Sequence, residues 1–424
     1  MKLQKISTSV IPFAGISFIN YDFNKSGIAQ LIDNELGVRG KKVGFSYSDI
    51  IKNFSSVFYC GGNCAEDLQT HFGKQLKLIP NNNVPSADTI LRGIKELSTP
   101  NSSFTSKQDK KYDFNINLKL NRLNIKTLIH TNQLIGGKYY DFDYDNQIIA
   151  TEKYDTKRTY KQTKGYFPGV ATIGNKIVYI ENRDGNANVK FEQESTLSRA
   201  YNLVNEENIK INRSRMDAGS YSKEIIKVVS SNSKLFYIRA NKSVEIYNQI
   251  RKISKWKTVE INYKNYEVAS IVFTQFFEEE NYRLVIMREK NKDNQIDMFT
   301  KDNFIYRSIL TNDWQNTEKE VIEYYNNRGS AEKIFDIMNN DFGWKHLPCS
   351  FMNENTAYLI ITAIIKNFYN YFVENISRIF KDIKPTTRLK RFIFRFISVA
   401  GKWVFKGRQW VLKLFTDRPY ELLI

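Results

Sequence analysis

The sequence predicts an α/β fold with a mixed β-sheet at its centre and helical regions at both ends of the chain. Apolar and polar side chains alternate, as they do in half-buried strands, in four segments: 139–145, 154–160, 170–173 and 176–180. Gly174-Asn175 supplies a tight turn between the last two segments. Helix, strand, helix and strand patterns follow within residues 196–239. Antiparallel strands followed by this alternation are typical of a mixed sheet covered by helices.

The other patterns divide the chain into six expected regions. Strand-like segments between residues 258 and 310 stand where the core would continue with a helix, and we interpret them as an insertion. The regions are a helical N-terminal DNA-binding region or helical cap (1–105), a linker and lead-in helix (106–135), the first part of the core (136–240), a β-rich insertion (241–305), the second part of the core (306–345) and a basic helical C-terminal region (346–424).

Charge is the first indication of function. The chain has 63 Lys and Arg against 45 Asp and Glu, a net charge of +18, which favours a polyanionic partner, with nucleic acid ahead of a membrane surface. Eleven Lys or Arg residues and one acid lie between residues 378 and 413. With three cysteines and neither a signal peptide nor a membrane span in the sequence, we expect a cytoplasmic protein.

Four acidic residues are candidates for a metal site. Asp143 and Asp145 lie on one face of the first core strand, because side chains two apart point the same way. Asp217 follows a later strand, and Glu332 lies in a helix that begins after the capping box Thr317-x-x-Glu320. Carboxylates without a histidine or cysteine cluster suit Mg²⁺ or Mn²⁺. Two such ions can activate a water or a 3′-hydroxyl against a phosphodiester.

The same helix carries two further candidates. Tyr325, Arg328 and Glu332 are spaced by three and four residues, so a continuous helix would place them on one face. Such a set often forms only an ion pair, but an arginine one turn from a carboxylate also suits phosphoryl transfer.

On these motifs the sequence resembles the DDE-type insertion-sequence transposases of bacteria, the cut-and-paste group with a Tyr-x-x-Arg-x-x-x-Glu signature. The resemblance covers roughly residues 40–415. The matching stretches are YYDFDYDNQII, GYFPGVATIGNKIVYIENRDGNAN, INRSRMDAGSYSKEI and LTNDWQNTEKEVIEYYNNRGSAEKIFDIMNNDFGWKHLPC. The signature is the most specific part, because its spacing and the capped helix agree.

The resemblance implies an RNase H-like catalytic core whose metal-binding triad is Asp145, Asp217 and Glu332. Asp143 is the alternative first acid; we favour Asp145, because the second acid of the family pattern is the usual ligand. The implied cofactor is Mg²⁺, with Mn²⁺ able to substitute, in a two-ion site. Tyr325 and Arg328 are implied to contact the cleaved strand.

Two further sets of DNA contacts follow from the resemblance. The family signature continues with a lysine where this sequence has Asn339, and Lys333 or Lys345 is expected to substitute. The β-rich insertion of similar transposases touches the transposon end, so Trp256 and Trp314 are candidates to stack on a flipped base. Either tryptophan could instead belong to the core.

The sequence therefore predicts a Mg²⁺-dependent DDE transposase. It would bind the inverted-repeat ends of its insertion sequence, cleave DNA by hydrolysis and join the 3′-hydroxyl ends to target DNA. The expected partners are double-stranded DNA and a second copy of the chain in a homodimer, without a membrane, at the bacterial nucleoid. The alternative is an RNase H-like DNA endonuclease or resolvase without strand transfer.

Overall fold

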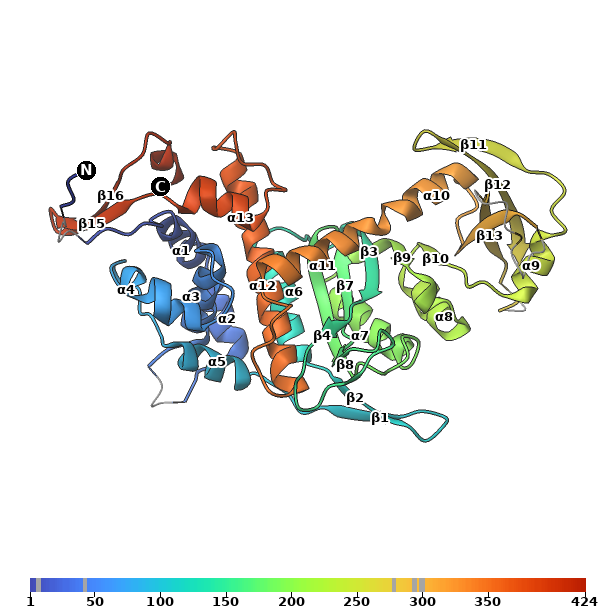
Figure 1. Cartoon of the computed structure of the whole chain (residues 1–424), viewed down its shortest axis with the longest axis horizontal. Coiled ribbons are helices and arrows are strands. Elements are labelled where there is room, and N and C mark those ends of the chain that lie inside the picture. Colours follow the sequence, from blue (N-terminus) through green and yellow to red (C-terminus); the bar gives the residue numbers. More distant parts are fainter. Residues whose placement is uncertain (5–8, 41–43, 277–279, 292–295, 297–301) are drawn as a thin grey trace.

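The computed structural model describes residues 1–4, 9–40, 44–276, 280–291, 296 and 302–424. Within these residues the chain forms a central β-sheet with helices on both faces and a helical body at one end, where both termini lie (Figure 1). The mixed α/β architecture that the sequence predicts is confirmed.

The central sheet has eleven strands in the described part of the chain. Their order is β1-β2-β8-β7-β3-β9-β10-β14-β13-β12-β11. The strands are β1 (Ser102–Thr105), β2 (Lys111–Asn115), β3 (Tyr139–Asn146), β7 (Gly169–Ile173), β8 (Lys176–Arg183), β9 (Lys210–Met216), β10 (Leu235–Arg239), β11 (Lys257–Ile261), β12 (Lys264–Phe273), β13 (Tyr282–Lys290) and β14 (Phe304–Thr311).

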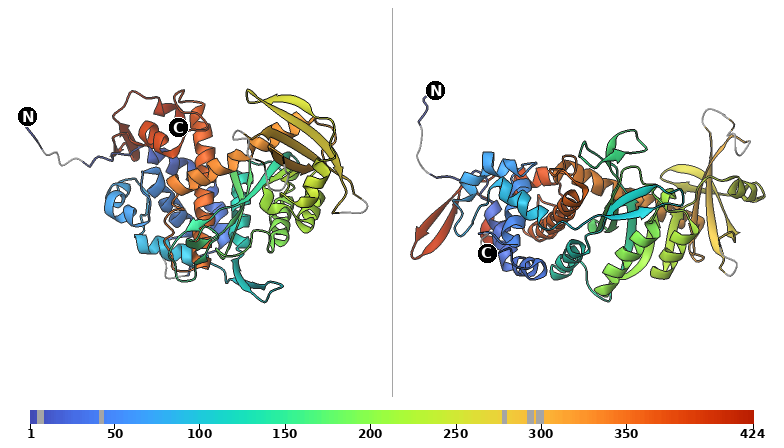
Figure 2. Two further views of the ribbon diagram at one scale, coloured as in Figure 1. Left: turned by 45° about the vertical axis from the view of Figure 1, so that its right-hand side comes forward. Right: turned by 90° about the horizontal axis from the view of Figure 1, so that it is seen from below.

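Five of these strands form the mixed core sheet that the sequence predicts, in the order β8-β7-β3-β9-β10. β3, β7 and β8 are successive antiparallel neighbours, whereas β9 and β10 continue the sheet parallel to β3. Parallel neighbours need crossover connections, and α7 (Gln193–Glu206) and α8 (Lys223–Asn232) supply them. These two helices pack on one face of the sheet, where they share an apolar cluster with Phe236 and Ile238. The helix Glu318–Asn326 packs on the other face, where it shares a second cluster with Tyr237 (Figure 2).

The β-rich insertion extends the core sheet. β14 pairs with β10 on one side and β13 on the other, and α9 (Val244–Ile250) connects the two regions. The helix α10 (Glu318–Asn326) follows β14 and contacts β13, β12 and β11. The insertion therefore supports one end of the segment that carries the Tyr-x-x-Arg-x-x-x-Glu signature.

The N-terminal helices share their apolar core with the C-terminal part of the chain. The helices are α1 (Ile16–Lys25), α2 (Ile28–Leu36), α3 (Tyr47–Tyr59), α4 (Gly73–Leu76) and α5 (Ala87–Lys95), with a π-turn η1 at Leu68–Phe72. α3 and α5 pack on the long helix α12 (Met352–Ser377), and the Tyr59 hydroxyl donates to the Ile365 carbonyl oxygen at 2.7 Å. α6 (Leu118–His130) packs against both α12 and β8. The N-terminal region is thus part of the main body, and its DNA binding stays a prediction.

Two local predictions are wrong. Residues 154–160 form turns with a two-residue strand, β5 (Lys157–Arg158), in a small sheet with β4 (Ile149–Ala150) and β6 (Lys164–Tyr166). The expected linker and lead-in region (106–135) begins with the turn and the second strand of the β1–β2 hairpin at the edge of the large sheet. In 154–160 the alternation is misleading, because Lys157 and Arg158 are the residues that pair in β5 and both are exposed. In β1 no side chain is buried, so the sequence has no apolar face that would indicate a strand.

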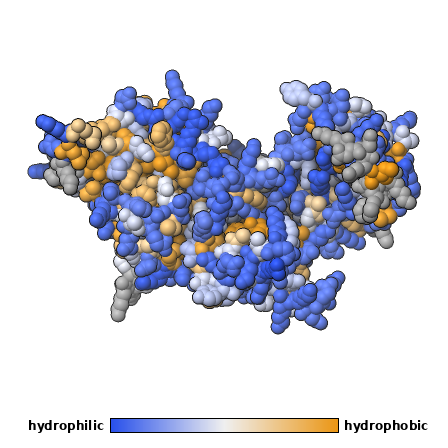
Figure 3. Space-filling model, viewed as in Figure 1, coloured by the Kyte–Doolittle hydropathy of each residue, from blue (hydrophilic) through white to orange (hydrophobic). Residues whose placement is uncertain are grey.

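The C-terminal tail is also not helical throughout. After α13 (Leu389–Phe392) and a π-turn η4 (Ile393–Ile397), it forms a hairpin of β15 (Gly401–Lys406) and β16 (Gln409–Leu414), before the 3₁₀ turn η5 (Tyr420–Leu423). Gly407 and Arg408 both have φ of +62°, which a type I′ hairpin turn requires. Apolar residues gather on this end of the molecule (Figure 3), and Phe405 and Trp410 are exposed near the hairpin tip. In the described residues, no helix has the length and apolar character to cross a membrane.

Candidate active site

Asp145 and Asp217 meet at the carboxyl ends of two neighbouring parallel strands. Tyr144 of β3 is paired with Met216 of β9, and each is followed directly by one of the two acids, Asp145 after Tyr144 and Asp217 after Met216. Both side chains line one cavity of about 540 Å³, which is also lined by the loop after β8. The proximity of Asp145 and Asp217 is what the sequence predicted from strand ends.

A tight turn fixes the Asp217 carboxylate. Asp217 caps the 3₁₀ turn η2 (Ala218–Ser220), and its Oδ1 accepts the Gly219 N–H at 2.9 Å. A methyl group on Gly219 would lie 2.9 Å from the same Oδ1, which is closer than real side-chain carbons approach. A side chain at position 219 would therefore displace the Asp217 carboxylate or Val189.

Asp145 shares its carboxylate with an arginine of the signature. Its Oδ2 accepts from Arg328 Nη1 at 2.8 Å, and its Oδ1 accepts the Asn146 N–H at 2.9 Å. Burial raises the pKa of Asp145, Arg328 lowers it, and the neighbouring Asp217 raises it again. Two carboxylates in one cavity repel each other, and a cation between them relieves that repulsion.

Tyr325 supports the same strand end. Its side chain is buried, and its hydroxyl donates to the carbonyl oxygen of Met216, next to Asp217, at 3.2 Å. Burial raises the pKa of Tyr325 to about 12, so the phenol is neutral at physiological pH. Tyr325 and Arg328 thus contact the two strands that carry the acids.

Glu332 does not join the two aspartates. α10 ends at Asn326, a 3₁₀ turn η3 (Asn327–Gly329) follows, and α11 (Ser330–Asp341) begins anew. The prediction of one continuous helix is wrong, because the 3₁₀ turn has about 3.0 residues per turn and rotates the side chains that follow. Glu332 is exposed and lines a different cavity, of about 650 Å³, between α11 and α12. Among the described residues, no three His, Cys, Asp or Glu side chains are grouped to hold a metal ion.

Asp143, the alternative first acid, belongs to a buried ion pair. Its side chain is 3% exposed and accepts from Arg215 Nε at 2.6 Å and Nη2 at 2.7 Å. Arg215 also donates to the Tyr324 carbonyl oxygen at 2.9 Å. The pair ties β3 and β9 to α10, which favours Asp145 as the accessible acid.

The other predicted contacts are dispersed over the molecule. Lys333 is exposed beside Glu332, and the Lys345 amine donates to Asn340 Oδ1 at 2.8 Å. Trp256 is half-buried in the insertion, where the Arg288 guanidinium lies 3.9 Å from its ring centre. Trp314 is 51% exposed. Their DNA contacts stay predictions.

The sequence did not predict the other residues that line this cavity. The cavity is also lined by an aromatic set and by a loop segment: Tyr112, Tyr160, Phe167, Gly185, Asn186, Ala187, Asn188 and Val189. The only signal was the Gly- and Asn-rich run after β8, which indicates a loop but not its place in the fold.

The donor set at Asp145 and Asp217 fits a divalent metal. Carboxylate oxygens are hard ligands of the kind that Mg²⁺ and Mn²⁺ bind, and both carboxylates face a cavity large enough for hydrated ions. Asp145 and Asp217 thus share one cavity, whereas Glu332 lies on α11, and metal binding by the three acids stays a prediction.

Comparison with known proteins identifies the family of the chain. The model of the family described as "Transposase DDE domain group 1" matches residues 140–424. A solved structure, the "Cryo-EM structure of piggyBac transposase synaptic complex with hairpin DNA", is similar at 12% identity and a TM-score of 0.43, covering 91% of this chain and 80% of that chain. A search of curated proteins gave no match. Because the family model matches well over half of the chain, this protein belongs to the family of transposases with a DDE domain of group 1.

Proposed function

We propose that this transposase binds the inverted-repeat ends of its own element, cleaves DNA by metal-dependent hydrolysis and joins the freed 3′-hydroxyl ends to target DNA. One observation carries the proposal. Asp145 and Asp217 lie side by side at the ends of β3 and β9 and face one open cavity. The family match supports an enzyme that acts on DNA.

Asp145 and Asp217 would hold Mg²⁺, or Mn²⁺ in its place, in a two-ion site. When bound, such ions stabilise the charge that develops on phosphodiester oxygens and make a bound water more acidic. The Asp217 carboxylate is already oriented by the Gly219 N–H, so little ordering is needed when a cation arrives.

Arg328 and Glu332 would complete the site in the DNA complex. In the DNA-free chain, Arg328 neutralises Asp145 at 2.8 Å. We propose that Arg328 transfers to a DNA phosphate, for which a guanidinium is well suited, and that α11 turns Glu332 toward the aspartates. The 3₁₀ turn at Asn327–Gly329 is where such a rotation would occur.

The proposed partners are double-stranded DNA and a second copy of the chain, because joining requires two element ends to be held together. Tyr325, Lys333 and Lys345 are proposed strand contacts. Trp314 is available to stack on a base, since it is 51% exposed. Activity at the bacterial nucleoid is part of the same proposal.

A strand-transfer assay separates the proposal from its alternative, an endonuclease or resolvase without joining. The purified chain is incubated with a DNA that carries the terminal repeats of its element, a target plasmid and Mg²⁺ or Mn²⁺. Products joined at 3′-hydroxyl ends are expected. Cleavage without any joined product would favour the endonuclease.

Asp217→Asn tests the metal site itself. Asparagine keeps the Gly219 hydrogen bond but removes the charge that a cation needs, so cleavage should fall by at least 10³-fold while binding of the ends survives. Asp33→Asn, a change far from the cavity at an acid that bonds Ser48, is the matched control. Retained cleavage in Asp217→Asn would remove Asp217 from the site.

A further inference from the structure

The loop that joins β8 to α7, residues 184–192, has an unusual anchor at its base. Arg183, the last residue of β8, is 0% exposed. Its Nη1 donates to the carbonyl oxygens of Phe191 at 3.1 Å and Val189 at 3.4 Å, and its Nη2 donates to Thr196 Oγ1 at 3.1 Å. The guanidinium also lies 4.5 Å from the ring centre of Phe114.

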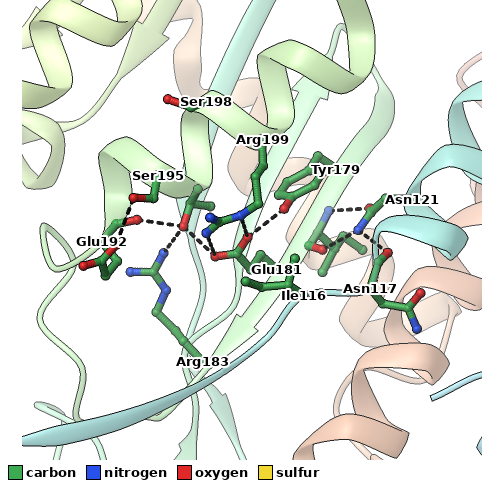
Figure 4. Close-up of polar contacts among 12 residues, drawn as sticks. Ile116, Asn117, Asn121, Tyr179, Glu181, Arg183, Glu192, Ser195, Ser198 and Arg199 are labelled. Carbon is green, nitrogen blue, oxygen red and sulfur yellow. Dashed lines mark hydrogen bonds and ion pairs between the residues drawn. The ribbon is translucent and has the colours of Figure 1, made fainter. Parts of the chain in front are cut away.

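Arg183 has no carboxylate partner among the described residues. The nearby Glu181 carboxylate is occupied by Arg199, at 2.9 Å to both nitrogens, and by the Tyr179 and Thr196 hydroxyls (Figure 4). A buried cation is costly unless its donors are satisfied. Here the loop carbonyls accept from Nη1 and Thr196 Oγ1 accepts from Nη2, whereas Nε has no partner among the described residues. The stabilisation of the Arg183 charge is therefore coupled to the conformation of the loop.

The loop in turn holds the turn that follows Asp217. The Lys190 amine donates to the Tyr221 carbonyl oxygen at 2.7 Å, and Gln193 Nε2, just beyond the loop, donates to Ser220 Oγ at 3.1 Å. Both acceptors lie within four residues of Asp217. Residues 184–193 and 217–221 are therefore bonded together at two points.

A third contact lies at the carboxylate. A methyl group built on Gly219 would be 3.0 Å from Val189 Cγ1 and 2.9 Å from Asp217 Oδ1, so Val189 packs directly over the glycine that bonds Asp217. The Val189 carbonyl oxygen is one of the acceptors of Arg183. A continuous series of contacts thus runs from Arg183 through Val189 and Gly219 to the Asp217 oxygen.

We propose that Arg183 is a positioning residue for Asp217, acting through the 184–192 loop and the Gly219 turn. Arg183 fixes the loop backbone, and the loop fixes the turn in which the Gly219 N–H orients the carboxylate. The significance for catalysis depends on the proposed metal role of Asp217, whereas the positioning itself is a structural property that is measured separately.

The experiment compares Arg183→Gln and Arg183→Lys with the control Arg199→Gln by hydrogen exchange and mass spectrometry. Arg199 belongs to the same buried network but bonds Glu181 and not the loop. In Arg183→Gln, exchange of the 216–222 amides should rise at least tenfold, with a smaller rise in Arg183→Lys, which keeps a cationic donor group. Arg199→Gln should lower the melting temperature without changing exchange of 216–222 relative to the rest of the core.

Cleavage kinetics provide the second readout. Arg183→Gln should lower kcat for end cleavage tenfold or more and leave KM for DNA unchanged, because the DNA-binding surface is intact. If Arg183→Gln does not fold, Val189→Ala removes the contact over Gly219 and should raise exchange of 216–222 by itself.

Two results would overturn the proposal. One is faster exchange of the loop in Arg183→Gln with full protection of 216–222, because the loop would then not hold the turn. The other is an equal rise at 216–222 in Arg199→Gln, which would indicate general destabilisation. If the wild-type protein does not cleave DNA ends, the proposed function is refuted. Hydrogen exchange of the 216–222 amides would still decide whether Arg183 positions Asp217.

Discussion

Asparagine substitutions at Asp143 and Asp145 should have opposite consequences, although the two acids are only two residues apart. Asp143 is buried and accepts two short hydrogen bonds from Arg215, whose guanidinium also stacks 4.7 Å from the Tyr324 ring centre. Asp145 lines the cavity, and its ion pair with Arg328 is part-exposed. The first acid should therefore serve stability, and the second should serve chemistry.

The structure sets the size of each effect. Removing one partner of a buried ion pair costs about 3–5 kcal/mol, because the remaining charge is left without compensation. Asp143→Asn should therefore lower the free energy of unfolding by about that amount. Burial already raises the pKa of Asp145, so removing its charge relieves desolvation and repulsion from Asp217, which offsets the loss of the partly exposed ion pair with Arg328. We expect Asp145→Asn to change stability by about 1 kcal/mol or less, in either direction, and to abolish cleavage.

Urea denaturation followed by tryptophan fluorescence, together with cleavage of a DNA end below the unfolding transition, measures both effects. The double variant Asp143→Leu/Arg215→Met is the control, because replacing a whole buried pair by apolar groups is often neutral. Asp143→Asn with wild-type stability and no cleavage would refute the reasoning and make Asp143 the metal ligand.

Three further predictions follow from the described side chains. Lys366 is 1% exposed, and burial lowers its pKa to about 7, so the folded state disfavours the charged form of this side chain. Lys366→Met should therefore stabilise the protein more at pH 6 than at pH 9, by on the order of 2–3 kcal/mol. Equal gains in thermal denaturation at both pH values would contradict this. The double variant Lys406→Ala/Arg408→Ala at the exposed hairpin tip should reduce the slope of log affinity for DNA against log salt concentration by the amount that about two phosphate contacts contribute. An unchanged slope would contradict this. Trp314→Ala should weaken binding of a pre-cleaved DNA end by about 1–3 kcal/mol without loss of stability. Trp256→Ala should instead destabilise the fold, since the Trp256 ring packs under Arg288. A lower melting temperature in Trp314→Ala together with weaker DNA binding by a stable Trp256→Ala would contradict both predictions.

The core could be predicted because its strands follow simple rules. Alternating side chains identified β3, β7 and β8, and strand-end acids identified Asp145 and Asp217, since parallel neighbours bring their carboxyl ends together. The same alternation was present in the tail, as Trp403 and Phe405 on one face and Lys402 and Val404 on the other. The high cation and aromatic content concealed it and favoured an amphipathic helix.

The third acid shows where the sequence was insufficient. Asn326, Asn327 and Gly329 are weak helix formers, yet the residues on both sides fit a helical pattern, and so the 3₁₀ turn was not predicted. Its effect on Glu332 depends on the packing of α11 beside α12, which no local pattern contains. Arg183 could not be identified for a similar reason, because its acceptors are backbone carbonyls that become available only after the chain folds.

The central claim is that Asp145 and Asp217 hold the catalytic metal. The most direct measurement is an anomalous difference map from crystals of the protein bound to an element end and soaked with Mn²⁺. We predict a peak about 2.0–2.2 Å from oxygens of both aspartates, with Glu332 turned toward it. A peak bound by other acids, such as Asp143, or a fully occupied Mn²⁺ site that excludes Asp217, would contradict the account.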